Sequence, residues 1–289
     1  MLSHTITKFL EERTAIRYSP NTIRCYKNTF DKLLANRGDM SIQSVTRDNI
    51  IEFLNSQGDI SAKTLRNYHS DLSALWQWAT ERSLCEENII RTVRAPIADK
   101  KDIIPLSKIE VFAVLNQARK IENAVLSLRN EAIIYLLLDS GIRASELCGI
   151  TIKDINKVVS HITVLGKGRK ERSVPISTTT MNKIMAYTTM RSMKTERIFT
   201  TRMNQEFTRN RLGHLLRYWG FEAGVPGVYP HRFRHTFAIQ FLRNGGNIYS
   251  LQKILGHTTL DMVKRYLAIA QIDLDRDHAK ASPVENWIE

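Results

Sequence analysis

The chain has 289 residues, of which 43% are hydrophobic and 25% charged, and it contains 4 Trp and 9 Tyr. This composition excludes an intrinsically disordered chain, and the length allows two domains, each with its own core. The three cysteines are widely spaced and form no CxxC pair, which argues against a disulfide framework or a zinc knuckle. No segment is apolar and long enough to span a bilayer, and the first residues lack an apolar signal region. We therefore expect a cytoplasmic protein with no membrane partner.

The formal net charge is +13, and it is distributed unevenly along the chain. Residues 1–100 carry 14 Lys and Arg against 12 Asp and Glu, a net charge of +2, whereas residues 101–289 carry 28 against 17, a net charge of +11. Such an asymmetry indicates that the second part faces a polyanion, with nucleic acid favoured over an acidic membrane. A basic protein without a polyanionic partner remains the alternative.

Short amphipathic helices are predicted throughout the first hundred residues. The first predicted helix spans 19–38, with Ser19 as its N-cap, Pro20 at its first position and a glycine at its end. Two more follow in 46–58 and 61–84, where apolar residues recur at helical spacing. No strand pattern interrupts them, so we expect an all-helical domain.

The next segment marks a domain boundary. Residues 96–104 are polar and charged and lack periodicity, which is typical of a linker. The expected domains are therefore residues 1–95 and 105–289. In the second domain, helices are predicted within residues 107–120, 128–141, 210–224, 234–246 and 249–269.

One segment of the second domain has strand character instead. Two runs containing β-branched residues, 162–165 and 172–176, flank a Gly-Lys-Gly turn, which is a hairpin signal. The expected fold class is mainly α, with a helical N-terminal domain and an α-rich second domain that carries a small antiparallel β-sheet.

The stretch YPHRFRHTFA crowds four cationic or titratable residues, His231, Arg232, Arg234 and His235, at the start of a predicted helix. Like charges at this spacing repel unless an anion binds there. A zinc protease motif would need a glutamate beside the first histidine, and here two arginines lie between the histidines, so we expect no metal and no cofactor.

A phosphate group fits this stretch better than a metal. Arginine binds phosphate oxygens bidentately and stays charged at any working pH, and two arginines can neutralise the charge of a phosphodiester transition state. His231 and Arg234 are three residues apart, so one helical turn presents both to a common point. A second arginine is available at Arg143, three residues before Glu146; taken alone, it is equally an exposed residue at a helix start.

Three further residues carry possible chemistry. Lys167 lies between two glycines in the hairpin turn, where it can either donate a proton to a leaving oxygen or remain a solvated tip. His257 and Tyr266 lie in the stretch LGHTTLDMVKRYL. The phenol of Tyr266 is either a nucleophile for phosphorus or a half-buried amphipathic side chain.

In their order along the chain, these stretches resemble the tyrosine site-specific recombinases, the phage integrase and Xer-type family. The motifs that carry the resemblance are SGIRASEL, GKGRKERSVPI, HRFRHTFA and LGHTTLDMVKRY. The resemblance covers nearly the whole chain. It implies that residues 1–95 form a core-binding (SAM-like) DNA-binding domain and that residues 105–289 form the catalytic domain.

The resemblance also implies a role for each residue that faces the scissile phosphate. Arg143 and Arg234 would grip this phosphate, His257 would hydrogen-bond one of its oxygens, and Glu146 would support the first arginine. With Lys167, His231 and Tyr266, the two arginines and His257 make up the family's six-residue set, and none of the six is missing from the chain.

For the bond exchange itself, the resemblance implies that Tyr266 forms a 3′-phosphotyrosine link to the DNA. Lys167 would protonate the departing 5′ oxygen, and His231 would handle the tyrosine proton. Arg232 and His235 receive no role from the resemblance, and contact with the DNA backbone and structural support are the options for them.

The implied partner is a double-stranded DNA recombination site. A homo-tetramer would act on two such sites through a Holliday junction, for DNA integration, excision or resolution. The tail, residues 268–289, would pack either on a neighbouring protomer or on its own domain. The alternatives are a type IB topoisomerase-like enzyme, which relaxes DNA with the same chemistry, and a non-catalytic DNA-binding regulator.

Overall fold

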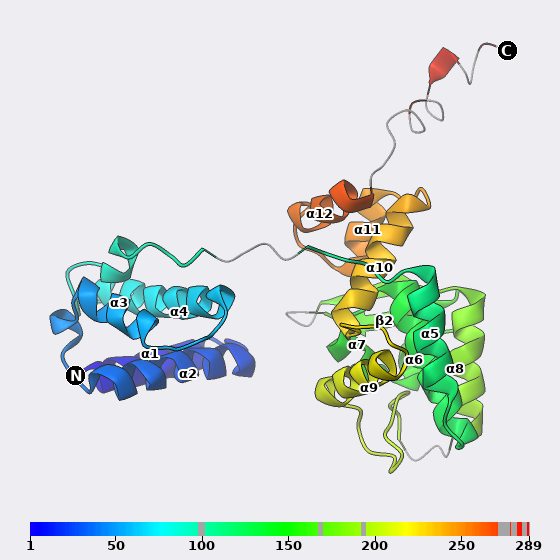
Figure 1. Ribbon diagram of the computed structural model, residues 1–289, viewed down its shortest axis with the longest axis horizontal. Coiled ribbons are helices and arrows are strands. Elements are labelled where there is room, and N and C mark those ends of the chain that lie inside the picture. The colour runs from blue at the N-terminus through cyan, green and yellow to red at the C-terminus, as the bar shows by residue number, and fades with distance from the viewer. Residues whose placement is uncertain are drawn as a thin grey trace. The chain divides into compact units, whose positions relative to one another are not determined.

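The computed structural model describes residues 1–97, 102–166, 170–191 and 195–270, together with residues 278, 282–284 and 288. The chain divides into two compact units, Met1–Lys101 and Asp102–Glu289, which we describe separately (Figure 1). The division falls within the segment that the sequence predicts as a linker. Most of the tail lies outside the described residues. None of the described helices combines the length and the apolar character that a membrane span requires.

The first unit is helical. Its elements are α1 (Leu2–Ala15), α2 (Pro20–Arg37), η1 (Ile42–Ser44), α3 (Arg47–Asn55), α4 (Ala62–Thr80) and η2 (Ile89–Thr92). The three predicted helices are confirmed, and the side chains of Ser19, Thr46 and Ser61 cap them by accepting backbone N–H groups. The helix α1 was not predicted from the sequence; its Phe9 lies in the core beside Phe30.

The second unit combines helices with one small sheet. Its helices are α5 (Lys108–Arg119), α6 (Ala124–Ser140), α7 (Ala144–Gly149), α8 (Thr178–Met190), α9 (Arg209–Glu222), α10 (Pro230–Arg243), α11 (Ile248–Leu255) and α12 (Asp261–Ala270). The strands are β1 (Ile155–Asn156), β2 (His161–Leu165) and β3 (Glu171–Pro175), preceded by η3 (Ile152–Asp154). They pair antiparallel in the order β1-β2-β3, with Ile162 opposite Val174. The mainly α fold with a small antiparallel sheet is thus confirmed.

The helix α6 lies at the centre of this unit. It packs against α5, α8 and α10, and these neighbours bury apolar residues on several of its sides, among them Ile133, Ile134 and Leu137. Because it is covered on several sides, α6 lacks the single apolar stripe of a surface helix. Because α6 ends at Gly141, its rigid end sets the position of the residues that follow, beginning with Arg143.

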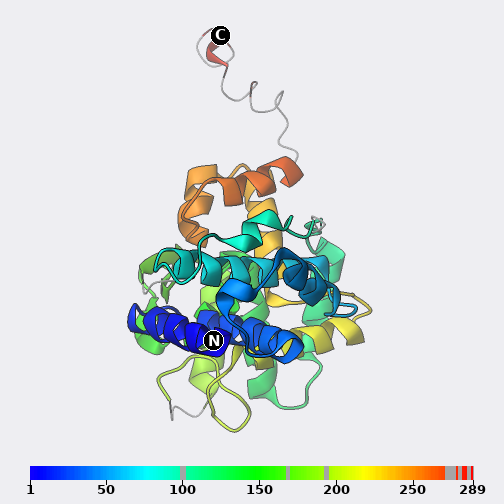
Figure 2. The ribbon, with the colours of Figure 1, turned by 90° about the vertical axis from the view of Figure 1, so that its left-hand side faces the viewer.

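Buried residues of the last three helices, α10, α11 and α12, form a second apolar cluster. The helices themselves are the yellow-orange to orange segments in Figures 1 and 2. The sequence predicted helical structure within 249–269, and the structure divides this stretch into α11 and α12. The helix α11 ends at Leu255, and Gly256, which adopts the left-handed conformation (φ +63°), caps it. We call this interruption between α11 and α12 the break. Glycine reaches this conformation without the Cβ clash that other residues meet. The break allows Tyr266 on α12 to face α10.

We predict that Gly141→Ala destabilises the second unit more than Gly227→Ala. Both glycines have positive φ angles of +58° and +67°, so both substitutions carry the left-handed penalty of about 1–2 kcal/mol. Only at Gly141 would the added Cβ lie 2.4 Å from Cδ1 of Phe237, because Gly227 has open space around it. Gly141→Ala should therefore lose about 1–3 kcal/mol more. Chemical denaturation measures both losses, and equal losses would contradict this packing.

Candidate active site

The first arginine of the site, Arg143, immediately precedes α7 and is oriented by Glu146. The carboxylate of Glu146 accepts the backbone N–H of Arg143 at 2.7 Å and its guanidinium Nη1 at 2.9 Å. A second guanidinium nitrogen, Nη2, lies 3.4 Å from the carbonyl oxygen of Gly256. The side chain remains 33% exposed, so part of the guanidinium is available to a ligand.

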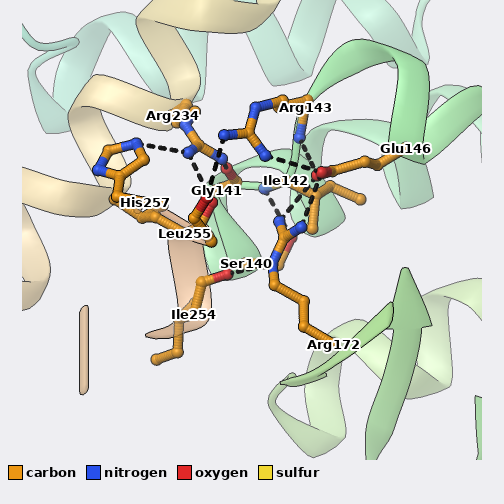
Figure 3. Close-up of polar contacts among 11 residues, drawn as sticks. Ser140, Gly141, Ile142, Arg143, Glu146, Arg172, Arg234, Ile254, Leu255 and His257 are labelled. Atoms are coloured by element: carbon orange, nitrogen blue, oxygen red, sulfur yellow. Dashed lines mark hydrogen bonds and ion pairs between the residues drawn. The ribbon is translucent and has the colours of Figure 1, made fainter. Parts of the chain in front are cut away.

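The carboxylate of Glu146 binds a second arginine that the sequence analysis did not single out. Arg172 on β3 donates from Nη1 and Nη2 to the two oxygens of Glu146, at 2.7 and 2.8 Å, and from Nε to the carbonyl oxygen of Ile254 at 2.7 Å (Figure 3). Burial raises the pKa of Glu146, but the hydrogen bonds and charges of Arg172 and Arg143 hold it below its ordinary value. Glu146 is therefore an anion shared by two cations.

The second predicted arginine, Arg234 on α10, is almost fully buried. Its Nη1 donates to the carbonyl oxygen of Gly141 at 2.8 Å, and its Nη2 donates to the carbonyl oxygen of Leu255 and to Nε2 of His257, both at 2.7 Å (Figure 3). Burial, with the nearby charge of Arg143, lowers the pKa of Arg234 to about 10, so it stays protonated at neutral pH. It joins the end of α6 to the end of α11.

His257, just after the break at Gly256, is also buried and neutral. Burial and the charges of Arg234 and Arg143 lower the pKa of His257 to about 4. Because an arginine can only donate, Nε2 of His257 is the acceptor and Nδ1 carries the proton. This Nδ1–H and the Nε–H of Arg234 are buried without a hydrogen-bond partner among the described residues. Unpaired buried donors are costly, and an anionic oxygen at this site would satisfy them.

The tyrosine of the site is held by a histidine to which the sequence gave no role. The hydroxyl of Tyr266 on α12 is hydrogen-bonded to Nδ1 of His235 on α10 at 2.9 Å. Its ring lies nearly parallel to that of His257, with centroids 6.4 Å apart. Burial raises the pKa of Tyr266, although the charge of Arg234 opposes this. The phenol is thus protonated at rest and lies beside the cationic cluster.

His235 is kept neutral by its surroundings. Burial, followed by the charges of His231, Arg234 and Arg265, lowers the pKa of His235 to about 4. The ring of His231, one helical turn earlier on α10, packs edge-on against His235 with a centroid separation of 4.4 Å. The predicted His231 is therefore connected to Tyr266 through His235.

The structure brings most of the predicted residues together. The contacts given above connect five of them: Arg143, Glu146, Arg234, His257 and Tyr266. His231 contacts His235, which in turn contacts Tyr266. Lys167 lies outside the described residues. Its flanking strands, β2 and β3, are confirmed as a hairpin.

Arg232, which received no role from the resemblance, is a structural residue. It is buried, and it donates to the carbonyl oxygens of Ile104 and Pro226 and to the carboxylate of Glu110. These contacts tie α10 to the segment before α5 and to α5. The option of a DNA backbone contact for Arg232 is therefore wrong, because its guanidinium is turned into the protein.

The sequence carried one signal for Arg172. In a strand, alternate residues share a face, and Arg172 lies on the same face as the buried Val174. A charged residue on the inward face of a hairpin needs a partner. For His235 no such signal exists, because its contact depends on where α12 packs.

The described ranges contain no group of three or more His, Cys, Asp or Glu side chains that could hold a metal ion. Within this part of the chain, the strongest charges at the site are those of the three arginines and the glutamate.

Comparison with known proteins identifies the family. The model of the phage integrase family matches residues 106–271. The tyrosine recombinase XerC of Myxococcus xanthus is 30% identical over 284 residues, covering 92% of each chain. The tyrosine recombinase XerD of Staphylococcus haemolyticus is 26% identical and covers 92% of this chain and 93% of its own.

Solved structures show the same fold. The Tn1549 transposon integrase in complex with circular intermediate DNA superimposes with a TM-score of 0.79 at 20% identity, covering 96% of this chain and 98% of that chain. The XerH site-specific recombinase bound to its palindromic substrate gives a TM-score of 0.72 at 19% identity, covering 97% and 84%. The chain therefore belongs to the phage integrase family and is a tyrosine recombinase, an enzyme of site-specific DNA recombination.

The buried, neutral His257 makes stability depend on pH. Its pKa is about 4 in the folded chain against an ordinary value of 6.5. Between these values the unfolded chain binds a proton that the folded chain does not, so the unfolding free energy falls as the pH drops from 6.5 to 4.

We predict that His257→Gln, which keeps an acceptor for Arg234, loses less stability over this pH window than the original chain. Carboxylates and His235 titrate in both chains, so their contribution cancels in the difference. Denaturation curves at several pH values measure this difference in the loss of unfolding free energy between the two chains. Identical declines in the two chains would contradict a neutral, buried His257.

Proposed function

We propose that this tyrosine recombinase cleaves and rejoins DNA at a specific site through a covalent 3′-phosphotyrosine intermediate formed by Tyr266. The observation that carries the proposal is the placement of the Tyr266 phenol beside His257, which is itself hydrogen-bonded to Arg234. Positive charge, buried unpaired donors and a nucleophile converge at this point. This is the set of groups that attack on a phosphodiester requires.

In the proposed cleavage step, the oxygen of Tyr266 forms a bond to phosphorus while the bond from phosphorus to the 5′ oxygen breaks. The phenol proton passes to His231 on α10, and His235 holds the hydroxyl until DNA binds. Lys167 supplies a proton to the departing 5′ oxygen. The reverse step restores the phosphodiester when a 5′ hydroxyl attacks the phosphotyrosine. One ester replaces another, so the exchange itself needs no nucleotide cofactor.

The two site arginines have different parts in this proposal. Arg143 has a partly exposed side chain and can contact a phosphate oxygen directly. Arg234 is buried and donates to two backbone carbonyl oxygens and to His257, so it supplies positive charge from within the site. Charge fixed in advance, in a buried setting, stabilises a transition state without the cost of reorganisation.

DNA would be held by both units. We assign residues 1–95 to core-site binding and residues 105–289 to catalysis and DNA binding, joined by the linker 96–104. The net charge of +11 in residues 101–289 supports contact with phosphate backbones. Recombination by strand exchange further requires a homo-tetramer on two DNA sites and a Holliday junction. The named relatives XerC and XerD support site-specific recombination, and the DNA-bound structures of the Tn1549 integrase and XerH support DNA as the partner.

Two assays test the proposed function. The original chain should recombine a plasmid that carries two copies of the DNA site it protects, and Tyr266→Phe should bind that site with unchanged affinity but yield no recombinant. Tyr266→Phe removes only the attacking oxygen, so the loss of product should be complete while the fold is kept. Relaxation of a supercoiled plasmid without recombination would instead assign the type IB topoisomerase activity. DNA binding without cleavage by the original chain would instead indicate a non-catalytic DNA-binding regulator.

Normal recombination by Tyr266→Phe would contradict the proposal. Tyr249→Phe is the matched control, because Tyr249 is an exposed tyrosine of α11. This variant should recombine at the original rate.

A further inference from the structure

Arg172 has three contacts that place it between three segments of the site. It lies on β3, its side chain is only 13% exposed, and it binds both oxygens of Glu146 and the carbonyl oxygen of Ile254. It also packs closely on the break between α11 and α12, since a Cβ on Gly256 would lie 3.1 Å from Cδ of Arg172. Figure 3 shows the guanidinium of Arg172 directed at Glu146.

We propose that Arg172 is a positioning residue for strand cleavage: it fixes the carboxylate of Glu146, and through that carboxylate the guanidinium of Arg143, while also fixing the end of α11. The proposal rests on the function proposed above, because it takes Arg143 as a phosphate-binding group. It assigns Arg172 no contact with DNA.

The contacts of Arg143 explain why a second arginine is needed. An arginine side chain is long and flexible, and the described acceptors of the Arg143 guanidinium are Oε1 of Glu146 and the carbonyl oxygen of Gly256. Arg172 holds both acceptors in place, the first by a bidentate ion pair and the second by its contact with the backbone two residues earlier. Without Arg172, the backbone N–H of Arg143 would still hold Oε2 of Glu146, but Oε1, which accepts the Arg143 guanidinium, would lose its second donor and be less firmly placed.

The geometry of this contact is specific to arginine. A guanidinium donates two parallel hydrogen bonds to a carboxylate and still offers Nε–H to a third acceptor. A lysine carries the same charge but cannot form the planar fork. Arg172→Lys therefore separates the orienting contact from the charge.

The chain offers a matched control in Arg232. Its side chain is 11% exposed, and like Arg172 it binds one carboxylate, that of Glu110, and backbone carbonyl oxygens. None of these partners belongs to the site. Arg232→Gln thus removes a buried arginine of the same kind at another place in the same unit.

The test uses the full chain and a nicked duplex that carries the DNA site it protects. Three quantities are measured: the dissociation constant for this duplex, the rate of covalent adduct formation at saturating duplex in a single turnover, and the thermal midpoint. Arg172→Gln should bind the duplex within about threefold of the original chain and form the adduct on the order of 100-fold more slowly, the loss expected for a misplacement of about 1 Å. Arg172→Lys should stay within about tenfold of Arg172→Gln, because it restores charge without orientation. Arg232→Gln should lose thermal stability but form the adduct within about threefold of the original rate.

The pH dependence of the adduct rate distinguishes a positioning role for Arg172 from a general loss of stability, which alone would not shift it. Glu146 faces Arg143, Arg172 and Arg234, and the small cavity beside it is lined by Asp154, Glu171 and Arg197. Arg172 is the largest of the influences that hold the pKa of Glu146 below its ordinary value against the effect of burial. Its removal raises that pKa. The adduct rate of Arg172→Gln should therefore begin to fall at a higher pH than that of the original chain, and Glu146→Gln in the same chain should abolish this difference.

Three outcomes would overturn the proposal. The first is an adduct rate of Arg172→Gln no slower than that of Arg232→Gln at every pH. The second is a loss of duplex affinity that matches the loss of rate, which would make Arg172 a DNA-binding residue. The third is full recovery of the rate in Arg172→Lys, which also carries the test if Arg172→Gln does not fold. Absence of any adduct with the original chain would refute the proposed function instead, so the two failures are distinguishable.

Discussion

The site depends on one buried carboxylate surrounded by an excess of positive charge. The side chain of Glu146 is 1% exposed and binds Arg143 and Arg172. Arg234 lies close enough for its charge to interact with that of Glu146. A buried ion is costly unless it is paired and hydrogen-bonded. One carboxylate cannot balance three guanidiniums, so the cluster is incomplete without a further anion. In our account, this anion is the scissile phosphate, and the sheet, α7 and α10 hold the cations in place for it.

The fold meets this constraint by bringing backbone carbonyl oxygens to the same point. The left-handed glycines Gly141 and Gly256 end α6 and α11, and the carbonyl oxygens at these two ends accept hydrogen bonds from Arg234 and Arg143. The break at Gly256 also separates α12 from α11, which turns Tyr266 toward α10. A single geometric feature, the helix end at Gly256, thus positions both the charge cluster and Tyr266.

Much of this arrangement could be predicted from residue types and their order. Helix caps such as Ser19 and the β-branched runs beside the Gly-Lys-Gly turn depend on local chemistry, and the structure confirms the elements they predict. The chemical kinds of Arg143 and Arg234 limit the ligand to an anion before any contact is known. The predictions of the helices and the hairpin succeed because they need only neighbouring residues, whereas the anionic ligand stays a prediction.

The rest depends on packing between distant segments. A pattern of apolar residues continues across Gly256, so periodicity predicts helical structure on both sides but does not place the boundary between α11 and α12. The contact of His235 with Tyr266 requires the position of α12 relative to α10, and the burial of Arg234 requires the ends of α6 and α11. Arg172 is a partial exception, because its place on the inward face of β3 is visible in the sequence even though its partners are not.

The central claim is that the phenolic oxygen of Tyr266 becomes esterified to the DNA backbone. The most direct measurement incubates the purified chain with a nicked duplex that traps the cleaved strand, separates the products on a denaturing gel and maps the DNA-linked peptide by mass spectrometry. Our account predicts a slow-migrating adduct whose DNA is attached to the peptide containing residue 266 through a 3′ phosphate. The absence of an adduct, or its attachment to another residue, would contradict the account.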